Sequence, residues 1–287
     1  MLIFLALGAT AAQDFQPDEQ IVYKKTPQGE LKLHVFYPKG EKEGMSRPAI
    51  VFFFGGGWQG GTPRQFYAQC AYLAAQGMVA MAAEYRVYNT HGTTPFECVK
   101  DGKSAIRWVR KNAEMLGIDT GRVIAGGGSA GGHVAATTAF IEGFEEGENL
   151  DQSAVPDALV LFNPALNTGG ERFIERLGVK SLEISPVHHI RENLPPCIIF
   201  HGTADNAVPY SQVEEFQRKM SDKGNLCLLI TSVGQAHSYF NNSHFADRFD
   251  NAYFNKTIYE THFFFKEIGM LEHFPGGWLK GWPEDLR

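Results

Sequence analysis

Short apolar runs alternate with longer stretches of helical spacing along most of the chain. Residues 48–54 are almost continuously apolar, which is typical of a strand covered on both faces. The predicted strands are 20–25, 31–37, 48–54, 78–84, 122–126, 158–162, 197–201 and 226–231, and the predicted helices are 65–76, 95–116, 130–142, 210–223 and 251–268. This alternation predicts an α/β fold with a mostly parallel central sheet and helices on both of its faces.

Two segments depart from the alternation. The first two predicted strands flank the turn Thr26-Pro27-Gln28-Gly29, which predicts a β-hairpin. Residues 163–192, here called the insert, are longer than an ordinary connection and hold one short helical stretch at 171–177. We expect the insert to form a small lid over a site at the carboxyl ends of the strands, where folds of this kind bind ligands.

Size and charge narrow the classes of protein further. The chain has 287 residues, 44% of them hydrophobic, so it can bury one sizeable core, and we expect residues 13–287 to form a single domain. Its formal net charge is -6, and Lys and Arg form no block or stripe. A nucleic-acid backbone requires a basic surface, so nucleic acid is not an expected partner.

The first twelve residues have a composition of their own. An apolar run at 2–7 is followed by small residues that include an A-x-A-like site, Ala9-Thr10-Ala11, as in the second half of a secretory signal. The run is too short to span a bilayer, and the usual charged start is missing because no Lys or Arg precedes Lys24. We expect residues 1–12 to be a signal-peptide remnant of a secreted or periplasmic protein without stable membrane insertion.

The cysteines give no sign of a metal centre. Cys70, Cys98, Cys197 and Cys227 are scattered, without a C-x-x-C pair or a histidine at ligand spacing, so neither structural zinc nor another cofactor is expected. Cys197 and Cys227 each begin an apolar run and are expected to be small buried hydrophobes. An exported chain would also permit a disulfide, so the pairing of the thiols stays open.

Candidate chemistry begins with the sequence GGGSAGGH at residues 126–133. It contains G-x-S-x-G at Gly127, Ser129 and Gly131, where small flanking residues allow a sharp turn that exposes a serine oxygen. A bare match could be a glycine-rich helix cap, but here an apolar strand precedes the motif and an alanine-rich helix follows it. The context predicts strand, turn and helix, with Ser129 at the apex and at positive φ.

A serine hydroxyl becomes a good nucleophile only when a base takes its proton, so a histidine and an orienting carboxylate are required. His237 lies in the loop after the last predicted strand, and Asp205 follows the strand before it. The chain order Ser129, Asp205, His237 is the one that a serine elbow of this type requires. These three residues are the predicted catalytic triad.

Other histidines are expected to be structural. His133 lies four residues after Ser129 and should pack or hydrogen-bond beneath the turn, while His201 should brace the turn that leads to Asp205. The adjacent His188 and His189 lack further ligands nearby.

The negative charge of a tetrahedral intermediate needs preorganised donors. One predicted donor is the backbone N–H of Ala130, next to the nucleophile, and the others are those of Gly56 and Gly57, after the strand that ends at residue 54. Trp58 is expected to line the substrate pocket. Tyr239, followed by another aromatic residue, is expected to offer a flat surface to the substrate.

These motifs together, FGGGW, GGGSAGGH, HGTADNAVP and GQAHS, resemble those of the α/β-hydrolase superfamily, in its carboxylesterase branch with an HGGGW-type oxyanion motif. Bacterial esterases of the acetyl xylan and feruloyl kind are most similar, and hormone-sensitive-lipase-like enzymes come next. The resemblance covers about residues 31–268 and implies a serine hydrolase that works through an acyl-enzyme. In one departure, Phe54 occupies the position of the histidine that usually organises the glycine loop.

The resulting hypothesis is a serine carboxylic ester hydrolase for short-chain or aromatic acyl esters. The charged residues and few large apolar ones of the insert argue against long acyl chains, and an exported location favours a carbohydrate alcohol. An arylformamidase and a peptidase-like amide hydrolase of the same fold remain alternatives, although the chain has no room for a large gating domain. A non-catalytic binding relative is less favoured, because both Ser129 and His237 are present.

Overall fold

The computed structural model describes residues 15–39, 46–147 and 149–271, so the predicted signal remnant at 1–12 lies outside them. In the described part, eight strands form one sheet in the order β1-β2-β4-β3-β5-β6-β7-β8. The strands are β1 (Glu19–Thr26), β2 (Gly29–Phe36), β3 (Arg47–Phe53), β4 (Val79–Ala83), β5 (Ile118–Gly128), β6 (Ala158–Phe162), β7 (Cys197–Gly202) and β8 (Cys227–Ser232). The β1–β2 and β2–β4 pairs are antiparallel and the other pairs are parallel. The predicted α/β class, hairpin and mostly parallel sheet are confirmed.

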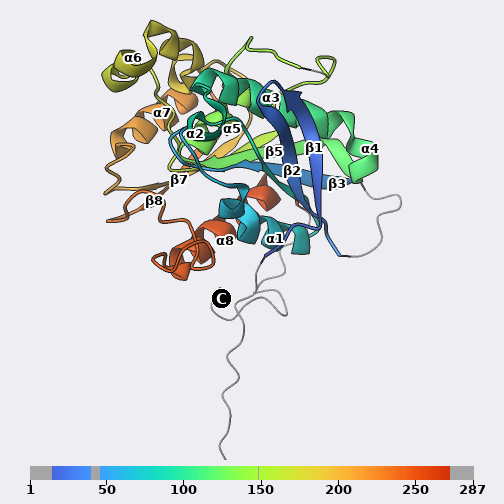
Figure 1. Cartoon of the computed structure of the whole chain (residues 1–287). Coiled ribbons are helices and arrows are strands. Elements are labelled where there is room, and N and C mark those ends of the chain that lie inside the picture. The colour runs from blue at the N-terminus through green and yellow to red at the C-terminus, as the bar shows by residue number, and fades with distance from the viewer. Residues whose placement is uncertain (1–14, 40–45, 148, 272–287) are drawn as a thin grey trace, which may run out of the picture.

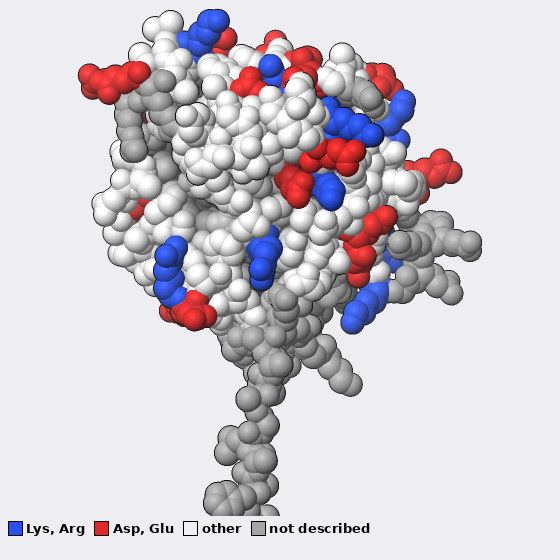
Figure 2. Space-filling model, viewed as in Figure 1, with Lys and Arg blue, Asp and Glu red and all other residues white. Residues whose placement is uncertain are grey.

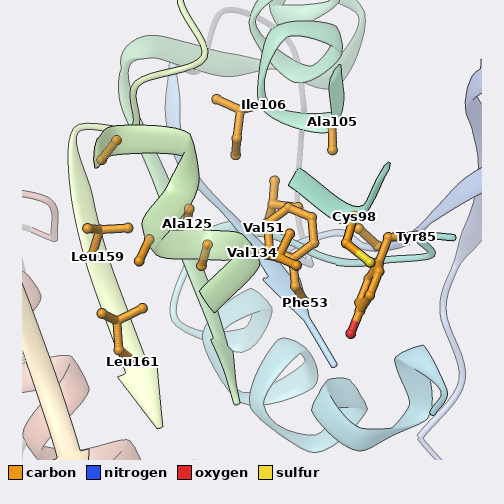
Figure 3. Close-up of a cluster of buried hydrophobic side chains, with 14 of the residues drawn as sticks. Val51, Phe53, Tyr85, Cys98, Ala105, Ile106, Ala125, Val134, Leu159 and Leu161 are labelled. Carbon is orange, nitrogen blue, oxygen red and sulfur yellow. The ribbon is translucent and has the colours of Figure 1, made fainter. Parts of the chain in front are cut away.

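Helices cover both faces of the sheet, as Figure 1 shows, with α3 and α5 above it and α1 and α8 below it. The helices are α1 (Tyr67–Ala75), α2 (Tyr88–His91), α3 (Pro95–Lys111), α4 (Ala113–Leu116), α5 (Ala130–Phe140), α6 (Glu171–Leu177), α7 (Tyr210–Asp222) and α8 (Asn251–Glu267). Strand β3 explains why its sequence is continuously apolar. Val51 and Phe53 enter the core cluster under α3 and α5, whereas Ile50 and Phe52 enter the cluster shared with α1 and α8. Figure 3 shows the first cluster, in which Val51 and Phe53 lie close to Val134 of α5.

Several element boundaries differ from those expected. The predicted helix 95–116 is divided at Asn112, where φ and ψ are -104° and 24°, into α3 and α4. Strand β5 begins at Ile118, four residues before the predicted start; Ile118 pairs with Arg47 of β3, and the register shifts before Val123 pairs with Ala49. A 3₁₀ turn, Pro63–Phe66, precedes α1, and the short α2 was not expected.

All four cysteines are buried, as was expected of Cys197 and Cys227. Cys70, Cys98, Cys197 and Cys227 are free thiols, and Cys197 lies opposite Cys227 in neighbouring strands with 3.1 Å between the two Sγ atoms. At the surface, Figure 2 shows acidic and basic side chains interspersed over the visible face. None of the helices formed by the described residues is both long and apolar enough to span a membrane.

Candidate active site

The GGGSAGGH sequence forms the sharp turn that its glycines predict. Ser129 lies between β5 and α5 with φ 53° and ψ -116°, so the expected positive φ is observed. Its N–H donates to the Phe162 carbonyl of β6 at 2.8 Å. A Cβ atom on Gly131 would lie 2.0 Å from the Phe53 carbonyl oxygen, and one on Gly127 would lie 2.4 Å from the Gly131 carbonyl oxygen. Side chains at these two positions would therefore collide with backbone, which explains the need for glycine.

The structure brings Ser129, His237 and Asp205 together from the ends of three strands. The Ser129 Oγ atom is 2.9 Å from His237 Nε2, and His237 Nδ1 is 2.7 Å from Asp205 Oδ2. Because a carboxylate only accepts, Nδ1 carries the proton and Nε2 is free to accept the Ser129 proton. The His237 side chain is 23% exposed and that of Asp205 is fully buried, so the imidazole is partly accessible to solvent while its carboxylate partner is not.

Asp205 is held as a carboxylate. Burial raises its pKa, but hydrogen bonds from His237 and from the Val208 and Ala207 N–H groups outweigh that effect, and the pKa lies below its usual value. The two N–H groups donate to Oδ1 at 2.9 Å each, which fixes the orientation of the carboxyl. His201 donates to the Val208 carbonyl at 2.9 Å and lies 3.3 Å from Asp205 Oδ2, so it braces this turn as expected.

The glycine loop after β3 lies against the nucleophile. A Cβ atom on Gly55 would be 3.4 Å from the Ser129 Cβ. Gly56 and Gly57 have φ values of 137° and 62°, a region that favours glycine. None of the hydrogen bonds found between described residues uses the N–H of Gly56, Gly57 or Ala130. These three groups are therefore open to an acceptor that enters the site.

His133 connects the turn, the glycine loop and the insert. It is fully buried, its Nδ1 accepts from the Trp58 indole N–H at 3.3 Å, and its Nε2 donates to the Ile184 carbonyl at 2.7 Å. Burial lowers the pKa of His133 to about 4. A structural role beneath the turn was predicted, but the bond to Trp58 was not. Within the insert, His188 contacts Ser185 Oγ at 2.8 Å and His189 the Leu182 carbonyl at 3.0 Å.

A pocket of about 150 Å³ opens beside Ser129. Trp58 and Phe173 of α6 both line it, and their rings pack on each other edge-to-face with 5.6 Å between the centroids. The insert therefore lies over the site. Its contribution through Phe173 was not predicted, nor was that of three further lining residues, Ala165, Ala207 and Val208.

Tyr239 does not fulfil the expectation of a flat surface for the substrate. It is 6% exposed, packs edge-to-face on Tyr253, and is not among the residues that line the pocket at Ser129. Phe240 stacks on Phe162 with 4.7 Å between centroids. The chain reverses at Ser238, where φ is 69°, and the next two rings enter the core.

The parallel sheet and the strand–serine–helix turn define an α/β-hydrolase, and the superfamily indicated by the motifs is confirmed. The chain belongs to the BD-FAE family, whose model matches residues 33–159 and 170–220.

Solved and curated relatives agree with this assignment. The chain is similar to an esterase of Thermogutta terrifontis solved with propionate bound, with 47% identity and a TM-score of 0.84, over 89% of this chain and 96% of that chain. It is also similar to two Mycobacterium tuberculosis proteins, esterase LipC (29% identity over 195 residues) and the probable carboxylic ester hydrolase LipM (32% over 190 residues). These alignments cover 60% and 59% of this chain but 48% and 44% of the relatives, so the chain spans about half the length of these curated relatives.

Proposed function

We propose that this chain is a serine carboxylic ester hydrolase that forms an acyl-enzyme on Ser129. The observation that carries the proposal is the continuous contact from Ser129 Oγ through His237 to Asp205, at 2.9 and 2.7 Å. The close relatives are named esterases, which supports the same chemistry.

The geometry supports a two-step reaction. Ser129 Oγ attacks the ester carbonyl carbon while its proton passes to His237 Nε2, and the intermediate then expels the alcohol, which takes that proton. A water molecule next attacks the acyl-enzyme, gives one proton to His237, and releases the acid as Ser129 regains its proton. In both steps the N–H groups of Gly56, Gly57 and Ala130 stabilise the oxyanion, and Asp205 stabilises the His237 cation.

The pocket favours a short acyl group. Its volume is about 150 Å³, and Trp58, Phe173 and Val208 give it apolar walls. A feruloyl group is far bulkier than an acetyl, propionyl or butyryl group, so the structure favours the short-chain half of the original hypothesis. The similar Thermogutta terrifontis esterase has been solved with propionate and with butyrate bound.

The alcohol is proposed to be polar and larger than the acyl group, such as a carbohydrate. A second cavity of about 450 Å³ has polar lining that includes Arg64, Asn242 and Asp247. In the sequence, Arg64 follows the glycine loop, and Asn242 and Asp247 follow His237, while the cavity and the pocket beside Ser129 have no lining residue in common. Export of the enzyme, which would place it near such esters, also remains a proposal that cell fractionation tests.

Labelling by an organophosphate tests the nucleophile directly. The Thermogutta terrifontis esterase 2 has been solved phosphorylated by paraoxon. For this chain we expect paraoxon to transfer its diethylphosphoryl group to Ser129 with release of p-nitrophenolate, which intact-protein and peptide mass spectrometry would detect. Ser129→Ala should abolish the label and lower kcat by roughly four to six orders of magnitude. Ser221→Ala on exposed α7 is the control, and a label that persists in Ser129→Ala would refute the assignment.

A substrate panel tests the acyl and alcohol preferences. We expect kcat/KM to be highest on acetate to butyrate esters, to fall on octanoate and palmitate esters, and to be retained on acetylated xylo-oligosaccharide. Methyl ferulate, an aryl formamide and a peptide amide represent the aromatic-acyl and amide-hydrolase alternatives. Fastest turnover on palmitate would indicate a lipase instead, and fastest turnover on the formamide an arylformamidase.

A further inference from the structure

The glycine loop at residues 55–61 has to hold its N–H groups in place without the imidazole that would be expected at position 54. Phe54 cannot accept or donate through its side chain, and its ring is covered by the Tyr85 ring at 4.3 Å between centroids. The loop is nevertheless tightly constrained, because a Cβ atom on Gly61 would lie 2.4 Å from the Phe54 ring. Other side chains must therefore fix the entrance of the loop.

Two buried polar side chains contact the backbone at that entrance, on either side of one peptide bond. Gln65 Oε1 accepts from the Gly55 N–H at 2.6 Å, and the Tyr85 hydroxyl donates to the Phe54 carbonyl at 2.6 Å. Gln65 is 7% exposed and Tyr85 is 1% exposed. The N–H and carbonyl of the Phe54–Gly55 peptide group are thus each satisfied by one side chain, which fixes its plane.

The orientation of this peptide group sets the position of the next two N–H groups along the chain. Gly55 also lies against the nucleophile, since a Cβ atom there would be 3.0 Å from the Gly128 carbonyl oxygen and 3.4 Å from the Ser129 Cβ. Beyond it, the Trp58 and Gln59 carbonyls accept from the N–H groups of Tyr88 and Asn89 at 3.0 and 2.9 Å. The exit of the loop is therefore held by backbone, and its entrance by Gln65 and Tyr85.

We propose that Gln65 and Tyr85 are positioning residues for the oxyanion donors Gly56 and Gly57. Neither touches the substrate; each acts by orienting the Phe54–Gly55 peptide group. Figure 3 shows the Tyr85 ring at the border of the core cluster beneath α3, so packing in that cluster fixes the ring that carries the hydroxyl. This inference rests on the proposed function, because the N–H groups matter to catalysis only if an oxyanion forms at Ser129.

The test compares two substitutions with matched controls. Gln65→Met keeps the length of the side chain and removes the acceptor, and Tyr85→Phe removes one oxygen while keeping the stack on Phe54. Gln69→Met is the control for the first, because Gln69 is 1% exposed and its side-chain oxygen and nitrogen make no hydrogen bond to any residue that the structure describes. Tyr23→Phe is the control for the second, because it removes a 2.6 Å bond to another backbone carbonyl, that of Glu84.

The expected result is a loss in kcat at nearly constant KM, because an oxyanion hole acts on the transition state and not on bound substrate. Gln65→Met and Tyr85→Phe should each lower kcat on p-nitrophenyl acetate by roughly tenfold to a hundredfold. The double variant should lose less than the product of the two, since both act on one peptide group. The controls should leave kcat, normalised to folded protein by circular dichroism, unchanged.

Unchanged kcat in Gln65→Met and Tyr85→Phe would overturn the proposal, and so would an equal loss in Gln69→Met and Tyr23→Phe. If Gln65→Met does not fold, Tyr85→Phe with its control decides alone. A wild-type protein that hydrolyses no ester and takes no label from paraoxon would instead contradict the proposed function, so the two failures are distinguishable.

Discussion

At the scale of single residues, His133 shows how a histidine close to the nucleophile is excluded from acting as the base. Its Nε2 donates to the Ile184 carbonyl and its Nδ1 accepts from Trp58, so neither nitrogen is available to Ser129. Burial lowers its pKa to about 4, so it is neutral at physiological pH. Protonation would place a charge in the core and break the bond from Trp58.

This buried imidazole predicts a loss of stability in mild acid. Above about pH 6.5, His133 is neutral in both states, while between about 6.5 and 4 the unfolded chain binds a proton that the folded protein does not bind. The free energy of unfolding should therefore fall by about 3 kcal/mol across that window, with no further contribution below it. Urea unfolding of the wild type and His133→Asn from neutral pH to pH about 4.5 measures this difference.

The expected result is a weaker pH dependence of the free energy of unfolding in His133→Asn than in the wild type. His201 is also buried with a lowered pKa and should account for part of the slope that remains. Asp205, whose pKa is lowered, adds a loss only below the range where a free aspartate titrates, so its effect is separable. Parallel curves for wild type and His133→Asn would show that His133 is not the group responsible.

Which residues the sequence could reveal depends on how local their contacts are. Ser129 was predictable because its turn is encoded by glycines two residues away, and Asp205 and His237 because each follows a recognisable strand. Their meeting in the structure agrees with the prediction, and their catalytic roles remain to be tested. Gln65 and Tyr85 act on positions 10 and 31 residues away through packing that no local pattern encodes.

At the scale of elements, the insert forms a wall of the pocket and not a loose cover. The Thr168 hydroxyl donates to the Ser181 carbonyl at 2.8 Å, and the Thr168 N–H donates to Ser185 Oγ at 3.0 Å. The Val187 N–H donates to the Leu166 carbonyl at 3.0 Å. These bonds tie the two ends of the insert together, so the position of Phe173 against Trp58 is part of the fold.

Shortening Phe173 is therefore expected to change acyl-length preference. Phe173→Ala removes a ring that lines the pocket and packs on Trp58, which makes room for a longer acyl chain. We expect the ratio of kcat/KM on octanoate to that on butyrate to rise by roughly tenfold. Apolar contacts of methylene groups in a pocket change kcat/KM by about this factor. Val179→Ala, at an exposed position of the insert, is the control and should leave the ratio unchanged. An unaltered ratio in Phe173→Ala would mean that the acyl chain lies elsewhere.

Element prediction succeeded where burial is strong on both faces and failed where it is not. All eight strands were identified, the central ones such as β3 from continuous apolar runs and β1 and β2 from their position on either side of a turn. The first residues of β5 were not predicted as part of the strand, because Asp119, Thr120 and Gly121 do not form an apolar run. Helix α2 is a single turn of four residues without a buried side chain, so it has no periodicity to detect.

At the scale of the whole molecule, a buried charge cluster joins the N-terminal hairpin to the rest of the sheet. Asp101 of α3 is fully buried and accepts from Lys24 of β1 at 2.7 Å and from the Arg86 guanidinium at 2.8 and 2.7 Å. The Arg86 N–H also donates to Asp101 at 3.0 Å. Glu146 pairs with both cations from the other side. The Asp101 carboxylate thus connects β1, α3 and the segment after β4. That segment also contains Tyr85, whose hydroxyl donates to the Phe54 carbonyl before the glycine loop.

Removal of that one charge should destabilise the whole molecule. Asp101→Asn keeps the shape of the side chain but leaves the buried Lys24 and Arg86 with Glu146 as their shared carboxylate partner. Two buried cations then share one carboxylate and one positive charge is uncompensated, so the free energy of unfolding is expected to fall by about 3 kcal/mol in urea unfolding at neutral pH. Asp151→Asn is the matched control, because Asp151 pairs with Lys111 at the surface with side chains 58% and 50% exposed, and it should leave the midpoint unchanged. Equal midpoints for both variants would show that the cluster contributes no more than a surface ion pair.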